Sequence, residues 1–441
     1  MPRPTAIRLL VAGYALITLV GAALLSLPVS TTSGSGQGFL DALFLASSGI
    51  STSGLTTVDV GSFYSLFGQI TLATIFQVGG LGYMAFFMLA VTVLGRRLSF
   101  RKLTVAAESV SGSDRVDLRR FFAAVVLYTL AFEGAGAAIL FLRWVASYPV
   151  PRAAYLGVFH SVSAFCTAGF SVFPDSLMAY RSDLTTNITI SLLSLFGGVG
   201  FLVLYDTHRL ILRVSKNKYP RRLAAHTKLV LVFTAFVVAG ASVAIFVVDP
   251  TCGATVRDRM MSSVFQAVSA STTDGFNTMD IGGMAPTSLL VLIVLMFIGA
   301  SPGSTGGGIK MTTFGVLALS VWSYLRGRTE TDFFRRRIPP ETTQKASAVF
   351  LLCLTVVAAD MLVMSATEKA SFLRLLFEVV SAMGNTGLST GITSSLTATG
   401  KVLLIATMFL GRVGPLAVGL SLLARSERTL FKNAAEDVYV G

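Results

Sequence analysis

One short phrase occurs four times in this chain, and its residue types suit the binding of a dehydrated cation. In every copy a Gly lies ten residues after a Phe and six residues after a Ser, and Leu or Phe follows it. The four glycines are Gly54, Gly169, Gly275 and Gly387. A cation that gives up its water needs a ring of oxygen ligands, which four loops around one axis can supply as backbone carbonyls. Glycine adopts at little cost the backbone conformations that turn such carbonyls inward.

The residues before each glycine are small or polar, so they can face a narrow, wet channel. They are Ser51, Thr52 and Ser53, then Cys166, Thr167 and Ala168, then Thr272, Thr273 and Asp274, and finally Gly384, Asn385 and Thr386. Together with the glycines they predict a selectivity filter for a monovalent cation. Asp274 either touches a cation or points away and pairs with the backbone. The competing interpretation is that the glycines serve tight turns or helix packing, but a fixed position in four copies favours the filter.

Acidic residues follow three of the four phrases. Asp59, Asp175 and Asp280 lie five or six residues after their glycines, and the fourth copy has Ile392 at that place. At a pore mouth, acidic groups raise the local cation concentration. Capping of turns is an equally good interpretation of the same residues.

The composition places these phrases in a membrane protein. The chain is 53% hydrophobic and 13% charged, with a mean hydropathy of +0.73, whereas average chains are about one-quarter charged. Eight stretches are apolar and long enough to span a bilayer: 7–29, 64–94, 121–142, 184–212, 228–248, 286–325 (interrupted), 346–365 and 396–424. Four more, of about 12 residues each, precede the glycines and are too short to span: 38–50, 155–166, 260–272 and 372–384. We predict re-entrant helices there.

The phrases therefore mark four internal repeats. The glycines are 115, 106 and 112 residues apart, and a regular period indicates repeated structural units. We predict an all-α integral membrane protein in which each repeat is a spanning helix, a pore helix and a second spanning helix (M1-P-M2). The predicted repeats are 1–95, 96–213, 214–326 and 327–441, the last with a cytoplasmic tail. Two spans per repeat make all four repeats parallel around one pseudo-fourfold pore, whereas an inverted-repeat carrier needs an odd number.

The charges indicate topology rather than a charged partner. If both termini are cytoplasmic, 25 of the 35 Lys and Arg residues fall on the cytoplasmic side, which is the positive-inside pattern. The net charge of +13 therefore does not call for nucleic acid. The three Cys and the three His residues, His160, His208 and His226, are scattered. They predict neither a disulfide framework nor a metal site nor a catalytic triad, so we expect no enzyme and no cofactor in this chain.

The third repeat contains a break in the middle of a span. Residues 299–310 read GASPGSTGGGIK, and so many Gly and Pro residues disfavour a continuous helix. Irregular backbone at membrane depth lines a cavity, so we predict a gate at Gly303, Ser304, Thr305, Gly306, Gly307 and Gly308, with a simple kink as the alternative. We expect Lys310 to reach toward the membrane interface by snorkelling.

Arg412 lies in the last span at the depth of that break. A charge inside a span is costly and indicates function, so Arg412 is predicted to act as a barrier or gate for cations. The alternative is a structural ion pair with Glu133 or Asp360. A second glycine echo supports the alignment of the repeats, because Gly79, Gly197, Gly299 and Gly411 follow the four phrase glycines by 24 to 28 residues. Small residues there let helices approach closely or bend.

These features resemble the Trk/Ktr/HKT superfamily of potassium transporters over essentially the whole chain. The resemblance rests on the fourfold phrase, on SPGSTGGGIKMTTF in residues 301–314 and on GRVGPL around Arg412. Within the superfamily, the chain looks like the membrane subunit of bacterial Ktr uptake systems.

The resemblance implies a homodimer in a bacterial inner or plasma membrane, in which each subunit has its own pore. It also implies a cytoplasmic RCK ring, similar to KtrA and holding a nucleotide, that opens the pore. The four phrase glycines would set selectivity, 301–309 would be the gate and Arg412 would help to obstruct the closed pore. Because all four filter positions are Gly, K+ is the expected ion. A sodium-translocating or Na+-coupled relative, and a secondary carrier with a midplane substrate site, stay open as alternatives.

Overall fold

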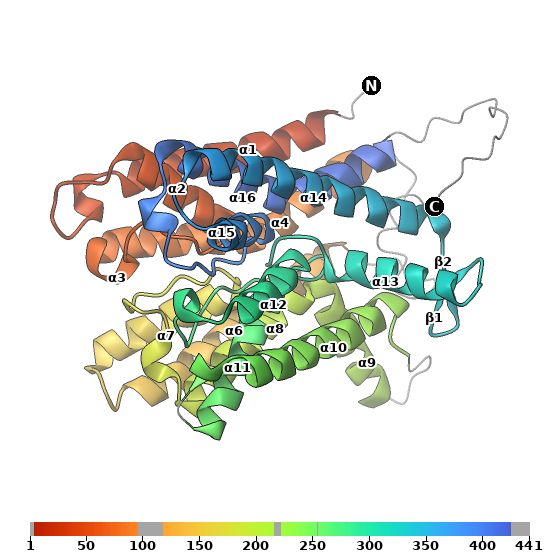
Figure 1. Ribbon diagram of the computed structural model, residues 1–441, viewed down its shortest axis with the longest axis horizontal. Coiled ribbons are helices and arrows are strands. Elements are labelled where there is room, and N and C mark those ends of the chain that lie inside the picture. Colours follow the sequence, from red (N-terminus) through yellow and green to blue (C-terminus); the bar gives the residue numbers. More distant parts are fainter. Residues whose placement is uncertain (1–3, 96–117, 216–221, 254, 425–441) are drawn as a thin grey trace.

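Fifteen α-helices account for most of the part of the chain that the computed structural model describes, which is residues 4–95, 118–215, 222–253 and 255–424 (Figure 1). The helices are α1 (Pro4–Leu25), α2 (Phe39–Ile50), α3 (Val60–Phe63), α4 (Leu66–Gly95), α6 (Leu118–Trp144), α7 (Val150–Phe165), α8 (Leu184–Val199), α9 (Phe201–Ser215), α10 (Ala225–Val248), α11 (Val256–Thr272), α12 (Pro286–Phe297), α13 (Met311–Leu325), α14 (Pro340–Thr367), α15 (Phe372–Gly384) and α16 (Ala398–Ala424). The predicted helical class is confirmed. The basic segment 96–117 and the C-terminal tail from residue 425 lie outside the described residues.

Short helices stand where the sequence predicts them. The helices α2, α7, α11 and α15 have 12, 16, 17 and 13 residues, and each ends just before one of the phrase glycines. At about 1.5 Å per residue the longest of them measures about 25 Å, less than the roughly 30 Å of a hydrocarbon core. Each helix therefore ends partway through the molecule, and an irregular loop follows it.

Several of the long helices have the length and apolarity of membrane spans. Among the described residues these are Phe121–Trp144, Ala225–Val248 and Pro340–Thr367, and the bent pair α8 and α9 makes a fourth if it counts as one span. The stretches Val11–Leu25 and Leu66–Leu81 are shorter apolar helices by the same measure. The full set of eight spans stays a prediction.

The predicted span 184–212 is wrong as one continuous helix, because the chain turns by 97° between α8 and α9. Gly200 has φ of +92°, and a Cβ there would lie 2.7 Å from the carbonyl oxygen of Pro302. The loop 298–310, which joins α12 to α13, lies against this bend. Its Ser301 N–H donates to Gly198 O at 2.9 Å, and the Phe201 N–H donates to Gly303 O at 2.9 Å. The loop thus satisfies backbone groups that a straight helix would have paired within itself.

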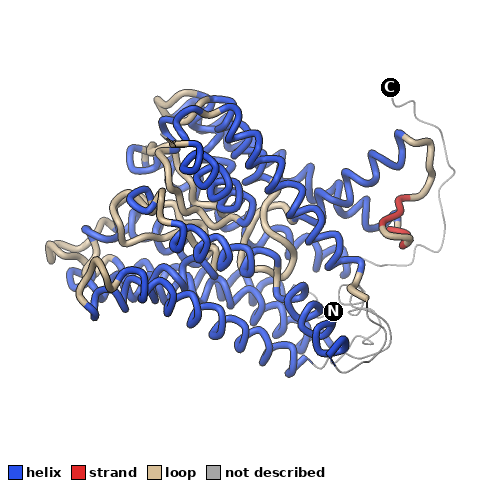
Figure 2. The backbone as a smooth tube through the Cα atoms, turned by 90° about the horizontal axis from the view of Figure 1, so that it is seen from below, coloured by secondary structure: helices blue, strands red, loops and turns tan. Residues whose placement is uncertain are grey.

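A small β-hairpin, which the sequence did not lead us to predict, joins α13 to α14. Strand β1 (Thr331–Phe333) pairs antiparallel with β2 (Arg336–Ile338), and Figure 2 shows it at one end of the molecule. Phe334 and Arg335 form the turn with φ of +47° and +60°. Such a turn usually carries Asn-Gly or Asp-Gly, and neither is present to reveal it.

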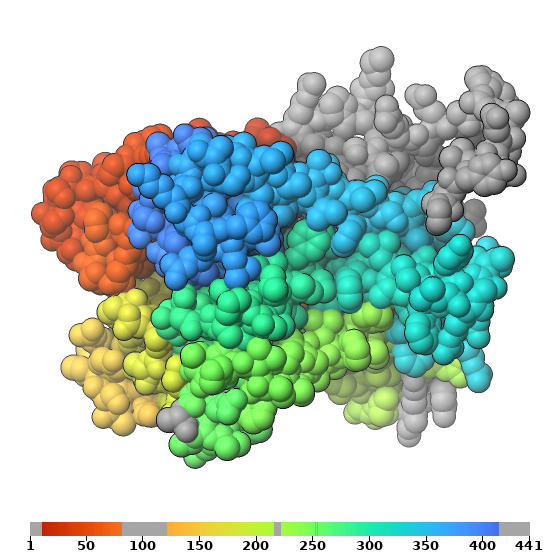
Figure 3. Space-filling view, viewed as in Figure 1, coloured from red at the N-terminus to blue at the C-terminus, as the bar shows by residue number. Residues whose placement is uncertain are grey.

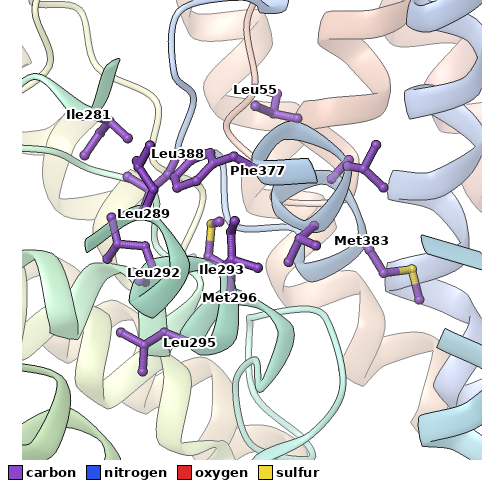
Figure 4. Packing of buried hydrophobic residues seen from close by; sticks show 14 of the residues in the cluster. Leu55, Ile281, Leu289, Leu292, Ile293, Leu295, Met296, Phe377, Met383 and Leu388 are labelled. Carbon is purple, nitrogen blue, oxygen red and sulfur yellow. The ribbon is translucent and has the colours of Figure 1, made fainter. Parts of the chain in front are cut away.

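The first and last quarters of the described chain pack against each other, so the four quarters form a closed arrangement. Helix α16 packs against α2 and α1, and the first and last quarters lie side by side in Figures 1 and 3. Lys401 Nζ lies 2.6 Å from Asp41 Oδ1 across this junction. The largest apolar cluster unites α12, α14, α15 and α16 on the adjacent side, and Figure 4 shows part of it. Packing thus joins the first quarter to the last.

Candidate ion pathway

The four phrase glycines form a closed ring of touching backbone, called here the glycine ring (Gly54, Gly169, Gly275 and Gly387). Their φ angles are +86°, +64°, +93° and +86°, a conformation that glycine adopts cheaply. A Cβ on any of them would lie under 3.0 Å from the carbonyl oxygen that precedes the glycine of the next copy. In ring order these oxygens are those of Ala168, Asp274, Thr386 and Ser53. The four loops, more than 100 residues apart in sequence, thus meet in the order 1-2-3-4-1.

Each loop makes the same turn at the end of its short helix. The N–H of the residue before the glycine donates to the carbonyl of the phrase Ser, at 2.7 to 2.9 Å in all four copies. In the third and fourth copies the Ser hydroxyl also accepts from the glycine N–H, at 3.1 Å for both Ser269 and Ser381. The fixed Ser-to-Gly spacing therefore reflects a hydrogen-bonded turn that presents the glycine to its neighbours.

The residues two positions before each glycine, already predicted as part of the filter, are also left-handed, which the sequence did not lead us to predict. Thr52, Thr167, Thr273 and Asn385 are all left-handed, with φ of +49° to +57°, and all are buried. Non-glycine residues rarely adopt this conformation, and it often marks a functional constraint. The signal was available, since three Thr residues and an Asn share one register, but conformation cannot be read from residue type alone.

The loop 298–310 packs directly against these four residues. The Thr305 hydroxyl donates to Phe165 O at 3.0 Å and lies 3.1 Å from the Thr167 hydroxyl. The Thr305 carbonyl accepts from the Thr52 hydroxyl at 3.1 Å, and the Gly307 N–H donates to the Thr273 hydroxyl at 3.3 Å. A Cβ on Gly307 would overlap the side chain of Asn385. The loop therefore touches all four copies at once, beside the glycine ring.

Arg412 fastens the same loop. Its side chain is only 3% exposed, and its guanidinium donates to Thr305 O and, at 2.8 Å, to Gly79 O. The alternative partners named from sequence are engaged elsewhere: Glu133 accepts from Gln77 at 3.0 Å and Asp360 from Thr407 at 2.6 Å. A guanidinium on this path raises the energy of a nearby cation.

Lys310 corrects a prediction. Its ammonium donates to Gly306 O at 2.8 Å and Gly307 O at 3.2 Å, so it folds back onto the loop instead of snorkelling. The cause is local, because the loop leaves carbonyls without helical partners and a nearby ammonium satisfies them.

The second glycine echo has a packing reason in three of the four copies. A Cβ on Gly79, Gly197 or Gly411 would lie under 3.0 Å from the carbonyl oxygen of Ile50, Phe165 or Met383, each four residues before its ring glycine. Gly299 meets Gly307 O instead, because its span breaks there. The next residue in the copies is Gly80, Gly198, Ala300 and Arg412, so the arginine occupies a place where its counterparts are small.

Three of the acidic residues near the phrases, Asp59, Asp274 and Asp280, make hydrogen bonds within the scaffold. Asp274 is buried and accepts from the Ser194 hydroxyl at 2.5 Å, so its carboxylate pairs with a side chain of α8 rather than with the backbone. Asp59 and Asp280 cap short helical turns through the N–H groups of Gly61 and Gly282.

The helical fold and the family match define an ion-transport protein of the membrane, not an enzyme. Residues 15–428 match the family model TrkH, described as a cation transport protein, and the chain belongs to that family.

Two similar proteins and one solved structure match almost the whole chain. It is 37% identical to the Ktr system potassium uptake protein B of Bacillus subtilis (strain 168), over 98% of this chain and 96% of the relative. It is 36% identical to the protein of the same name from Vibrio alginolyticus, over 98% and 94%. The crystal structure of the potassium transporter TrkH from Vibrio parahaemolyticus has the same fold, with a TM-score of 0.72, 19% identity and coverage of 96% and 85%.

Proposed function

We propose that this chain is the potassium-translocating membrane subunit of a Ktr-type uptake system. The closed ring of four glycine loops carries the proposal, since it brings four peptide carbonyls from four loops to one place, as a cation filter requires. K+ as the ion follows from the two relatives named as potassium uptake proteins. The filter would consist of the glycine ring and the three residues before each glycine, with K+ at the carbonyls.

The fourfold architecture forms part of the proposal. Four parallel M1-P-M2 repeats would surround the ring, with α2, α7, α11 and α15 as pore helices and both termini in the cytoplasm. Helix C-terminal ends carry partial negative charge, so four such ends beside the ring favour a cation. The repeated turn at each ring glycine supports this arrangement.

The loop 298–310 would be the gate. In the present conformation it is tied to all four copies through Thr305 and Gly307 and to α16 through Arg412. Opening requires those bonds to break together, which suits control by a partner. We propose that a cytoplasmic RCK ring with a bound nucleotide supplies this control and that the subunit works as a homodimer, as in Ktr systems. The sodium alternative is not favoured, because all four ring positions are glycine and the two relatives described above are named potassium uptake proteins.

Growth at low potassium tests the proposal. The chain is expressed with and without an RCK partner in a bacterium that lacks its own potassium uptake systems. We expect growth and K+ uptake with the partner present, and loss of both in Gly275→Ser, whose Cβ would collide with Thr386 O. Membrane content of each variant is measured by immunoblot. Uptake of Na+ without K+ in liposomes, or full activity of Gly275→Ser, would contradict the proposal.

A further inference from the structure

Glu378 is a buried carboxylate behind the fourth loop of the glycine ring. It lies in α15, nine residues before Gly387, and is fully buried. Its Oε1 accepts from the Ser389 hydroxyl at 2.6 Å and from the Thr390 N–H at 2.9 Å. Its Oε2 accepts from the Thr393 hydroxyl at 2.8 Å. One carboxylate therefore holds the segment that leaves the ring, from two to six residues past the glycine.

The partners of Glu378 are arranged to donate. The Thr390 N–H can only donate, and the Ser389 oxygen already accepts from the Gly391 N–H at 2.9 Å, which leaves the Ser389 proton for the carboxylate. A carboxylate with donors on both oxygens is used as an acceptor throughout. A buried donor that loses its acceptor carries a desolvation cost. Replacing the carboxylate would leave buried donors without partners.

The equivalent residues in the other copies hold their loops less firmly. They are Leu45, His160 and Gln266, each nine residues before its ring glycine. His160 Nε2 lies 3.0 Å from the Ser171 hydroxyl, and Ser171, like Ser389, is two residues past its glycine. Leu45 has no polar atom in its side chain, and the side-chain amide of Gln266 has no hydrogen-bond partner within the described ranges. The fourth loop thus has the strongest side-chain clamp of the four.

Apolar packing surrounds this clamp. Phe377 and Leu388, the chain neighbours of Glu378 and Ser389, lie close together in the apolar cluster of Figure 4, with Ile281 and Leu289 nearby. The bonds from Thr390 and Thr393 to Glu378 are buried, and the bond from Ser389 is partly buried. Buried hydrogen bonds are stronger than exposed ones, and unpaired buried groups are costlier.

We propose that Glu378 is a positioning residue that fixes the fourth loop of the filter and so contributes to the discrimination between K+ and Na+. This inference rests on the proposed function. Discrimination depends on how the coordinating carbonyls are placed and how far they can move. A loosened fourth loop lets its carbonyls close around the smaller Na+ ion.

Ion competition in proteoliposomes of the full chain tests this role. Rubidium tracer uptake is measured against increasing Na+ and K+ for Glu378→Gln, with Glu368→Gln as the matched control. Glu368 also accepts from a Thr, at the Thr397 N–H (3.1 Å), but it lies away from the ring. We expect Glu378→Gln to lower the Na+ concentration that halves uptake by about tenfold, the size expected from leaving one buried donor unpaired. In Glu378→Gln we also expect a higher K+ concentration to be needed to halve uptake, with a smaller change in the maximal rate. Glu368→Gln should give the values of the parent chain.

Two further variants keep the outcomes separate. Ser389→Ala removes one partner of the carboxylate and is expected to shift Na+ competition in the same direction by a smaller factor. Gly387→Ser serves as the test of the filter itself and is expected to alter selectivity. If it does so while Glu378→Gln leaves the competition profile unchanged, the inference is overturned. If Glu378→Gln does not fold, Ser389→Ala is judged in its place. If Gly387→Ser also leaves selectivity unchanged, the filter assignment itself fails. A fall in thermal stability of Glu378→Gln without a change in competition shows a purely structural role and overturns the inference.

Discussion

Single glycines decide the geometry of the proposed pathway. Two independent constraints act on each ring glycine: a φ angle that disfavours side chains, and a neighbouring carbonyl oxygen where a Cβ would sit. Either constraint alone is common in loops. Together, in four copies, they restrict each position to glycine because a substitution must move a loop that touches the next copy.

Gly54→Ser is expected to admit more Na+. Its Cβ would lie 2.6 Å from Ala168 O and 3.3 Å from the Cα of Gly387, so the first loop must shift and change the ring of oxygens. We expect the preference for K+ over Na+ to fall by about tenfold or more, as for a strain of roughly 1–3 kcal/mol. Ion competition on cells at matched expression measures it.

Gly34→Ser is the matched control for this substitution. Gly34 also has a left-handed backbone, with φ of +69°, but nothing lies within 4 Å of an added Cβ. Gly34→Ser should lower the stability of the protein slightly and leave the preference for K+ over Na+ unchanged. Equal selectivity in Gly54→Ser and the parent chain would remove Gly54 from the filter.

Among the elements, the loop 298–310 contacts all four copies as well as α8 and α16. Its backbone replaces the missing helical bonds at the end of α8, and Thr305 and Gly307 reach the residues beside the glycine ring. Arg412 adds a charged tether from α16. In the gate that we propose, these bonds would release together when the pore opens.

Arg412→Gln is expected to weaken regulation. The shorter neutral side chain cannot make both guanidinium bonds, so the engaged state of the loop loses stability and the cation barrier falls. We expect K+ uptake without the regulatory partner to rise several-fold, with the effect of the partner reduced accordingly. Uptake in cells with and without an RCK partner measures this. Lys401→Gln, in the same helix but paired with Asp41, is the control, and a partner dependence identical to the parent chain in Arg412→Gln would argue against the tether.

At the scale of the whole molecule, the four copies close into one body with two distinct ends. The loops around residues 30–60 lie at one end and the β-hairpin at the other (Figure 1). The hairpin end carries Arg328 and the run Arg335 to Arg337. Positive charge of this kind is typical of the cytoplasmic side.

Cysteine labelling tests this orientation. In a Cys252→Ser background, in which the two remaining cysteines, Cys166 and Cys353, are buried, single cysteines are placed at Ser33 and at Phe334, both exposed. A membrane-impermeant maleimide should label Ser33→Cys in intact cells and Phe334→Cys only after permeabilisation. Labelling of both sites from the same side would contradict the proposed topology.

The positions of the short helices and of the break could be predicted from the sequence because they depend on short-range chemistry. Apolar runs and the Phe-Ser-Gly spacing located the four short helices before the ring glycines to within five residues, and the Gly-rich run after Phe297 marked the break before α13. Local patterns of this kind depend on which residues can sit in lipid or in a tight turn, and those preferences belong to the residues themselves.

The sequence by itself determined the helical class, the fourfold period and the positions where only glycine fits. The tertiary structure alone decided what those positions meet: the closed ring order, the bend at Gly200, the loop that fills it, and the partners of Lys310, Arg412 and Glu378. The physical reason is that these contacts join residues up to 334 positions apart. Which distant carbonyl or hydroxyl a buried polar group finds depends on how all the helices pack together, and no local pattern records it.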